Sequence, residues 1–252
     1  MGSVPASAML VGSQDIPLTR LPPSPYNTAV MLHFDSRSSE SDLRLALVEC
    51  GRICYDRRLM TSNDGNLSAR LDDGRVLITP SGISKGRMRA EDLLLIDMAG
   101  RVIGKDTGSH PSSETPMHLE VYGQRSDLQA VIHAHPVFAT ALTVAGLDFP
   151  TDILPETLLL LGEVPVAAYA SPSTAEDAEA IRPLIGRHRA ILLRQHGTLT
   201  CGADLDEALL HLERLEHVAE VFWRARALGH VEHLTPEARR RLDAVRGKCS
   251  SR

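Results

Sequence analysis

Three histidines in two short segments have the side-chain type and the spacing of a metal site. His133 and His135 form an H-x-H pair at the end of an apolar, strand-like run, residues 130–134. Side chains at i and i+2 of a strand point to the same face, so both imidazoles can converge on one ion. On its own, such a pair is equally compatible with a metal site and with two surface histidines at a strand end. His196 follows a second apolar run, residues 190–193, and three imidazoles leave one position of a tetrahedral ion open, as in catalytic sites.

A carboxylate and two serines lie in the segment Pro111–His118. Glu114 opens a predicted helix, and Ser112 and Ser113 precede it in the loop. Hydroxyl groups and the free amides of a helix start form a natural anion site, although ordinary N-capping explains the same residues. His118 lies four residues after Glu114 on the same helix face. We therefore expect His118 to lie next to the metal site or in the core, in preference to binding the metal itself.

Two glycine-containing loops between predicted strands have the composition of phosphate-binding loops. Gly65 and Asn66 lie in the first loop, and Ser81 and Gly82 lie in the second. Glycine and small hydroxyl residues let backbone amides approach an anion closely. Either loop by itself is also typical of an ordinary turn.

The elements that must position these residues alternate between hairpins and strand–helix units. Ser39 and Asp42 predict a capping-box start for the first helix. Strands are expected at residues 66–71, 75–79, 93–97, 101–103, 130–134, 164–169, 190–193 and 198–201. Helices are expected up to about residue 58 and at 114–124, 137–145, 174–184, 205–228 and 236–245. This order predicts an α/β fold with a mixed sheet covered by helices. The proline-rich residues 1–38 are expected to form an extended N-terminal arm, and residues 39–252 the single domain.

Composition excludes several classes of protein. The 252 residues carry 27 Lys and Arg against 32 Asp and Glu, a net charge of −5, whereas nucleic-acid and membrane-surface binders are usually basic. No apolar run approaches the roughly 18 residues that a membrane helix needs. Four cysteines without a C-x-x-C pair, and no secretory signal pattern at the start, predict a cytoplasmic protein with buried thiols at Cys50 and Cys54.

The segments G-N-L-S, T-P-S-G, P-S-S-E, H-A-H-P and Q-H-G follow one another along the chain. In this order, over about residues 40–230, the chain resembles the class II aldolase/adducin-head family, which includes L-fuculose-1-phosphate aldolases and ribulose-phosphate epimerases. The resemblance implies a three-layer sandwich with a mixed, mainly antiparallel sheet. It also implies a homotetramer with active sites at the subunit borders, acting on a small phosphorylated ketose.

The resemblance assigns roles to the residues singled out above. It implies that His133, His135, His196 and Glu114 hold one Zn²⁺ per subunit, or another divalent ion such as Mn²⁺ or Co²⁺, with Glu114 as the catalytic acid and base. It implies that the substrate phosphate is bound by six residues: Gly65, Asn66, Ser81, Gly82, Ser112 and Ser113.

The resemblance favours an aldolase that cleaves a ketose 1-phosphate to dihydroxyacetone phosphate and a small aldehyde. Fuculose, deoxyribulose and methylthioribulose phosphates are all possible substrates. The similar epimerases carry Asp where this chain has Glu114, and their further catalytic Asp has no match in residues 152–158. The aldolases carry a tyrosine in that region, where this chain has leucines, so the proton donor to the aldehyde is not assigned. Alternatives are an epimerase, decarboxylase or dehydratase that uses the same site, and a non-catalytic interaction module, against which the four intact ligands argue.

Overall fold

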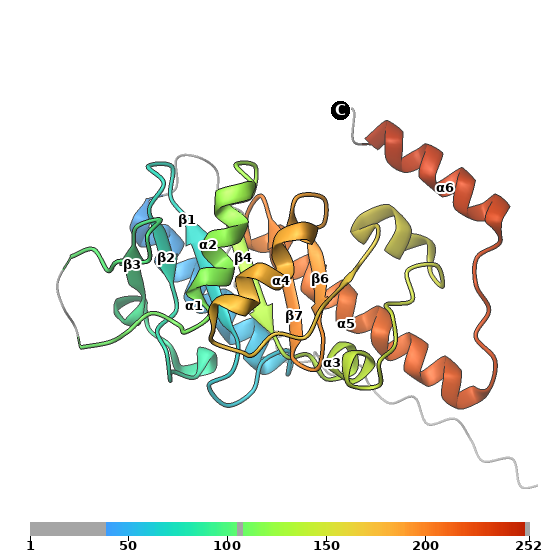
Figure 1. Ribbon diagram of the computed structural model, residues 1–252, viewed down its shortest axis with the longest axis horizontal. Helices are drawn as coiled ribbons and strands as arrows, with labels where there is room; N and C mark the ends of the chain where they lie inside the picture. Colours follow the sequence, from blue (N-terminus) through green and yellow to red (C-terminus); the bar gives the residue numbers. More distant parts are fainter. Residues whose placement is uncertain (1–38, 105–107, 250–252) are drawn as a thin grey trace, which may run out of the picture. The chain divides into compact units, whose positions relative to one another are not determined.

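The computed structural model describes residues 39–104 and 108–249 (Figure 1). Within this part of the chain, one seven-stranded sheet carries helices on both faces, which confirms the predicted α/β sandwich. The arm expected at residues 1–38 lies outside the described residues, so the boundary to a domain of residues 39–252 stays a prediction. None of the described helices is both long enough and apolar enough to cross a membrane.

The sheet is mixed and mainly antiparallel, as expected. Its strands are β1 (Asn66–Arg70), β2 (Val76–Ile78), β3 (Leu94–Ile96), β4 (Ala130–Ala134), β5 (Val166–Ala167), β6 (Ala190–Leu193) and β7 (Gly197–Gly202). They lie in the order β3-β2-β1-β4-β7-β6-β5, and only β5 and β6 run parallel. The prediction of a strand at residues 101–103 is wrong: Val102 forms one isolated bridge to Ile96, and Gly104, at φ +102°, turns the chain out of the extended conformation directly afterwards.

The helices agree with the predicted ranges to within a few residues. They are α1 (Glu40–Asp56), α2 (Thr115–Gln124), α3 (Val137–Val144), α4 (Ala175–Ile185), α5 (Leu205–Leu228) and α6 (Pro236–Cys249). Short helical turns form at Lys85–Arg87, Ala90–Asp92 and Thr157–Leu161. Ser39 and Asp42 form the predicted capping box of α1, in which each side chain binds the other residue's backbone N–H. The described cysteines Cys50, Cys54 and Cys201 are buried free thiols.

The two faces of the sheet have separate hydrophobic cores. Helices α1, α3 and α5 pack on one face, and α2 and α4 pack on the other. On β4, Ile132 packs on the α1 side and Val131 on the α2 side, since neighbouring strand residues point to opposite faces. Fully burying such a side chain contributes about 1.5–3 kcal/mol. His133, two residues after Val131, therefore lies at the α2 side of a strand held firmly from both faces.

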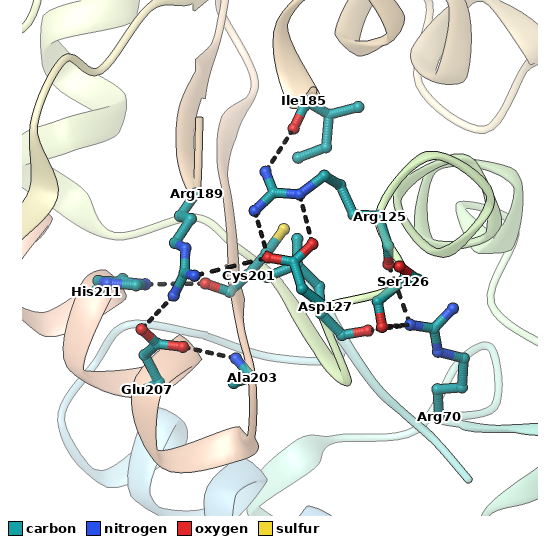
Figure 2. Close-up of polar contacts among 11 residues, drawn as sticks. Arg70, Arg125, Ser126, Asp127, Ile185, Arg189, Cys201, Ala203, Glu207 and His211 are labelled. Carbon is teal, nitrogen blue, oxygen red and sulfur yellow. Dashed lines mark hydrogen bonds and ion pairs between the residues drawn. The ribbon is translucent and has the colours of Figure 1, made fainter. Parts of the chain in front are cut away.

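A polar network connects several elements at the end of the central strands that lies away from His133 (Figure 2). Asp127, just before β4, accepts two hydrogen bonds from Arg125, at 2.8 and 2.7 Å, and lies 3.7 Å from Arg189. Arg189 also pairs with Glu207 in the first turn of α5. Nδ1 of the buried His211 donates to the Cys201 carbonyl at 2.8 Å. These contacts hold α2, β6, β7 and α5 together at one end of the central strands. The three predicted histidines lie at the other end.

Candidate metal centre

Antiparallel pairing of β4 with β7 brings the three predicted histidines together. The end of β4, with His133 and His135, lies beside the start of β7, which His196 precedes. Gly197 makes this approach possible: a Cβ there would lie 2.5 Å from the Ala134 carbonyl oxygen and 2.5 Å from Cδ2 of His135. Any side chain at this position would push the two strand ends, and so the histidines, apart.

The imidazoles converge at distances that suit a metal ion. Nε2 of His133 lies 2.9 Å from Nε2 of His135, and the three ring centroids are 4.8, 4.7 and 5.0 Å apart. One candidate ligand atom from each of His133, His135 and His196 lies within 4.8 Å of the others. Tetrahedral zinc with bonds of roughly 2.0–2.1 Å holds its nitrogens about 3.3 Å apart. Small side-chain adjustments would therefore suffice to bind such an ion.

A hydrogen bond to the backbone orients the His133 ring. Its Nδ1 lies 2.9 Å from the Thr198 carbonyl oxygen, which can only accept, so Nδ1 carries the hydrogen. The lone pair of Nε2 therefore faces the other two imidazoles. Burial lowers the pKa of His133 to about 3, and burial also lowers the pKa of His135. Neutral imidazoles oriented by a carbonyl are the form in which histidine binds metals.

Glu114 completes the set from the start of α2. Its Oε2 lies 3.3 Å from Nε2 of His133, and its Oε1 lies 3.2 Å from Nε2 of His196. Nδ2 of Asn66 donates to Oε2 at 2.6 Å. Burial raises the pKa of Glu114, but the hydrogen bonds from His196 and Asn66 act against it, and the pKa lies well below its usual value. An ionised carboxylate beside three imidazoles fits a divalent cation.

Of the predicted phosphate-binding residues, Gly65 and Asn66 lie against the histidine cluster. Gly65 has φ +73°, and a Cβ there would lie 2.8 Å from the His133 carbonyl oxygen, so the loop needs glycine to pack against the end of β4. Asn66 is buried, with its amide bound to Glu114 and His118. Its side chain therefore supports the carboxylate, and its phosphate role stays a prediction.

The other two predicted phosphate segments lie side by side. The Ser81 amide donates to the His110 carbonyl at 2.9 Å, and the Ser112 amide donates to the Thr79 carbonyl at 3.2 Å. The Ser112 hydroxyl accepts a hydrogen bond from the Glu114 amide at 3.3 Å. The Ser113 hydroxyl is hydrogen-bonded to the hydroxyl of Ser173, just before α4. These bonds connect the loop of Ser81 and Gly82 to the start of α2, as a shared phosphate site requires. The phosphate itself stays a prediction.

Lys85 is a site neighbour that sequence reasoning missed. It is 3% exposed, and its Nζ donates to the carbonyl of Asn63 at 2.6 Å and to that of Ile83 at 3.0 Å. These carbonyls belong to the two glycine-containing loops, so one ammonium group connects both. Burial lowers the pKa of Lys85 to about 8, against the attraction of Asp64 and Glu114. A lone lysine three residues after Gly82 gives no signal in the sequence that separates it from a surface lysine.

Replacing Lys85 with methionine should loosen both loops. Methionine fills a similar volume but leaves the carbonyls of Asn63 and Ile83 without their donor, and losing these partly buried hydrogen bonds costs about 0.5–1.5 kcal/mol. We expect the free energy of unfolding in urea to fall by that amount. The control Arg87→Met, at an exposed position in the same turn, should leave it unchanged within about 0.5 kcal/mol. Equal stability of the two variants would contradict the structural role of Lys85.

Comparisons with known proteins agree with the fold. Residues 45–223 match the family model described as the class II aldolase and adducin N-terminal domain. A 3-oxo-tetronate 4-phosphate decarboxylase of Haemophilus influenzae is 38% identical over 70% of this chain and 85% of its own. An L-fuculose phosphate aldolase of Methanococcus maripaludis is 34% identical over 68% of this chain and 90% of its own.

Solved structures agree as well. The structure of YgbL from Klebsiella pneumoniae superposes with a TM-score of 0.74 at 32% identity, over 81% of this chain and 99% of that one. The family match extends from α1 to α5 and includes every residue of the histidine cluster and Glu114. This chain belongs to the class II aldolase and adducin N-terminal domain family, whose enzymes are metal-dependent and act on phosphorylated sugars.

Proposed function

We propose that this protein is a divalent-metal-dependent lyase that breaks a carbon–carbon bond next to the carbonyl of a phosphorylated substrate. The observation that carries the proposal is the ionised Glu114 carboxylate lying against His133 and His196. Such a bond cleavage leaves a negatively charged enediolate, which needs both charge stabilisation and a group that moves protons. We favour zinc as the ion, held by the three histidines and Glu114, and manganese or cobalt would also suit these ligands.

Decarboxylation of a 3-oxo-tetronate 4-phosphate is the reaction that we favour. Breaking its C1–C2 bond releases CO₂ and leaves the electron pair in the enediolate of dihydroxyacetone phosphate. CO₂ departs as a neutral molecule, so no residue has to remove a proton from the leaving group. One carboxylate that delivers a proton to the remaining carbon is then sufficient, and Glu114 supplies it. The 38% identical decarboxylase supports this substrate.

Aldol cleavage of a ketose 1-phosphate is the second candidate. It is the reaction that the sequence resemblance favours. It produces the same dihydroxyacetone phosphate enediolate, and the 34% identical L-fuculose phosphate aldolase favours it. The two reactions differ only in the departing half, which is an aldehyde instead of CO₂. The aldehyde forms from a hydroxyl group that must lose its proton, so this reaction needs a second base.

The residues of the chain divide the work in either case. A divalent ion bound to the histidines would act as a Lewis acid and stabilise the negative charge on the substrate oxygens. The hydrogen bond from His196 helps to hold the pKa of Glu114 low, so moving Glu114 away from the cluster when substrate enters would raise its pKa. Glu114 can then take a proton from water and deliver it to the substrate carbon. The loops of Gly65, Ser81 and Ser112 would bind the phosphate.

An assay for dihydroxyacetone phosphate tests the proposal. Purified protein loaded with zinc, manganese or cobalt is incubated with 3-oxo-tetronate 4-phosphates and with ketose 1-phosphates. Release of CO₂ together with dihydroxyacetone phosphate supports the decarboxylase, and release of an aldehyde supports the aldolase. If no metal-loaded protein forms dihydroxyacetone phosphate from any of these substrates, the proposal is wrong and the interaction module gains support.

Ser81→Asp is expected to raise KM for the phosphorylated substrate by about 10- to 100-fold. Ser81 is exposed in its loop, so the change should leave the fold intact, while the new carboxylate repels the phosphate dianion. The measurement is KM for the substrate found in the assay above. Asp73→Asn, at an exposed turn position in the β1–β2 hairpin, is the control for a charge change away from the site. An unchanged KM in Ser81→Asp would show that the phosphate binds elsewhere.

We also propose that the protein assembles as a homotetramer with its active sites at the subunit borders. The proposal depends on family membership, and mass measurement by light scattering in solution tests it directly. A monomeric mass at the concentrations used for the activity assay would contradict it.

A further inference from the structure

A line of five buried side chains leads from the interior to the Glu114 carboxylate. Tyr122 Oη lies 2.7 Å from Ser68 Oγ, and Ser68 Oγ lies 2.7 Å from Nδ1 of His118. Nε2 of His118 lies 2.5 Å from Oδ1 of Asn66. Nδ2 of Asn66 donates to Oε2 of Glu114 at 2.6 Å. All five residues are at most 8% exposed, so water does not compete for these bonds.

The line exists because a helix and a strand have matching repeats. On α2 and its N-cap, Glu114, His118 and Tyr122 are four residues apart, which is about 6 Å along a helix. On β1, Asn66 and Ser68 are two residues apart, which is about 6.6 Å along a strand. The helix residues therefore alternate with the strand residues, and each polar group meets a partner on the other element.

The chemistry of the groups fixes the direction of the bonds near Glu114. An ionised carboxylate only accepts, so the amide nitrogen of Asn66 must face it and the amide oxygen must face His118. That oxygen also only accepts, so Nε2 of His118 must carry a hydrogen. Burial lowers the pKa of His118 to about 4, which leaves the ring neutral with a single N–H. Nδ1 of His118 is therefore an acceptor.

The same argument fixes the direction of the hydrogen bonds in the half of the line nearer Tyr122. Ser68 must donate its hydroxyl hydrogen to Nδ1 of His118, and its oxygen then accepts from the Tyr122 hydroxyl. The other acceptor near Tyr122, the Gln129 carbonyl oxygen, is 3.5 Å away and offers a much weaker bond. Every hydrogen in the line consequently points toward Glu114.

We propose that His118 is a positioning residue: as its Nε2–H tautomer it holds the Asn66 amide so that an N–H always faces Glu114. Without this N–H, the amide could rotate by 180° and present its oxygen to the carboxylate, and two acceptors would repel each other. The Asn66 N–H binds Oε2 of Glu114 independently of the histidine cluster, so it remains a fixed point when substrate separates the carboxylate from His133 and His196. The catalytic consequence of this role depends on the proposed function, but the tautomer does not.

Two amide substitutions of His118 separate positioning from packing. In His118→Gln the side-chain nitrogen can occupy the place of Nε2 and still donate to Asn66. In His118→Asn the shorter side chain reaches only the place of Nδ1, so Ser68 keeps its partner and Asn66 loses its donor. We expect kcat of His118→Asn to fall on the order of 10- to 100-fold with KM little changed, while His118→Gln retains most of kcat.

His211→Asn is the matched control. His211 is also buried, and it binds a backbone carbonyl at the opposite end of the sheet (Figure 2), so this variant should keep the wild-type kcat. Full activity of His118→Asn would overturn the proposal. Equal losses of kcat in the asparagine and glutamine variants would overturn it as well, because packing alone would then explain them.

The tautomer is measured without any reaction. In metal-free protein with ¹⁵N-labelled histidine, NMR should show His118 with a protonated Nε2 and an unprotonated Nδ1. In Ser68→Ala, which removes the donor to Nδ1, Nε2 should stay protonated, because the Asn66 oxygen still accepts from it. An imidazolium or an Nδ1–H tautomer in the wild type would overturn the proposal. Loss of the proposed function would instead appear as absence of turnover in the wild type, with the tautomer unaffected.

Discussion

Replacing Glu114 with glutamine is expected to lower kcat by about 10²- to 10⁴-fold, the contribution of a well-placed proton-transfer group. Glutamine has the same shape as glutamate and can still accept the hydrogen bond from Asn66 through its amide oxygen. It cannot take up and release a proton at neutral pH. Three histidines remain as ligands, so we expect the variant to keep its metal ion.

The experiment needs both kcat and the metal content of each protein. Glu120→Gln is the matched control, because Glu120 lies on the same helix and pairs with Arg182 at 3.0 Å, away from the histidines. It should retain wild-type kcat. Loss of metal in Glu114→Gln with an intact fold would show that Glu114 serves mainly as a ligand. Unchanged kcat would show that another group moves the proton.

The histidine cluster could be predicted from the sequence because each part of its signal is local. The period of two along β4 places His133 and His135 on one face, and the apolar runs mark where strands end. The pairing of β4 with β7 is not local, since more than 60 residues separate the partners. The residue pattern suggested that His196 joins the pair at a strand end, and the resemblance to a known family supported that link.

The support around Glu114 could be predicted only in part. The sequence predicts a strand over residues 66–71, but it does not predict that the polar residues Asn66 and Ser68 are buried. They are buried because α2 covers their face of the strand with polar side chains at matching intervals, including His118. Such a match depends on the register between a helix and a strand about 50 residues apart, which no local pattern contains. Lys85 could not be predicted either, because a lone lysine after a loop looks like a surface lysine in the sequence.

Removing the metal ion is expected to destabilise the wild-type protein, and His196→Gln is expected to remove this response. A ligand that binds only the folded state stabilises it by about 2.7 kcal/mol when its free concentration is one hundred times Kd. The four ligand residues come from three segments, the end of β4, the residue before β7 and the N-cap of α2, so they meet only when the sheet has formed. We therefore expect a higher unfolding temperature with zinc than with a chelator.

His196 is the ligand best suited to this test, because its side chain is 12% exposed and that of His133 is fully buried. Glutamine at position 196 should weaken metal affinity by more than roughly 100-fold, since even residues that only orient metal ligands change affinity by 10- to 100-fold. His217→Gln, at an exposed position on α5, is the control and should respond to zinc like the wild type. The measurement is the unfolding temperature across a zinc titration. If the wild type unfolds at the same temperature with zinc, manganese, cobalt and chelator, the cluster does not bind a metal, and both the decarboxylase and the aldolase lose the group that stabilises their common enediolate.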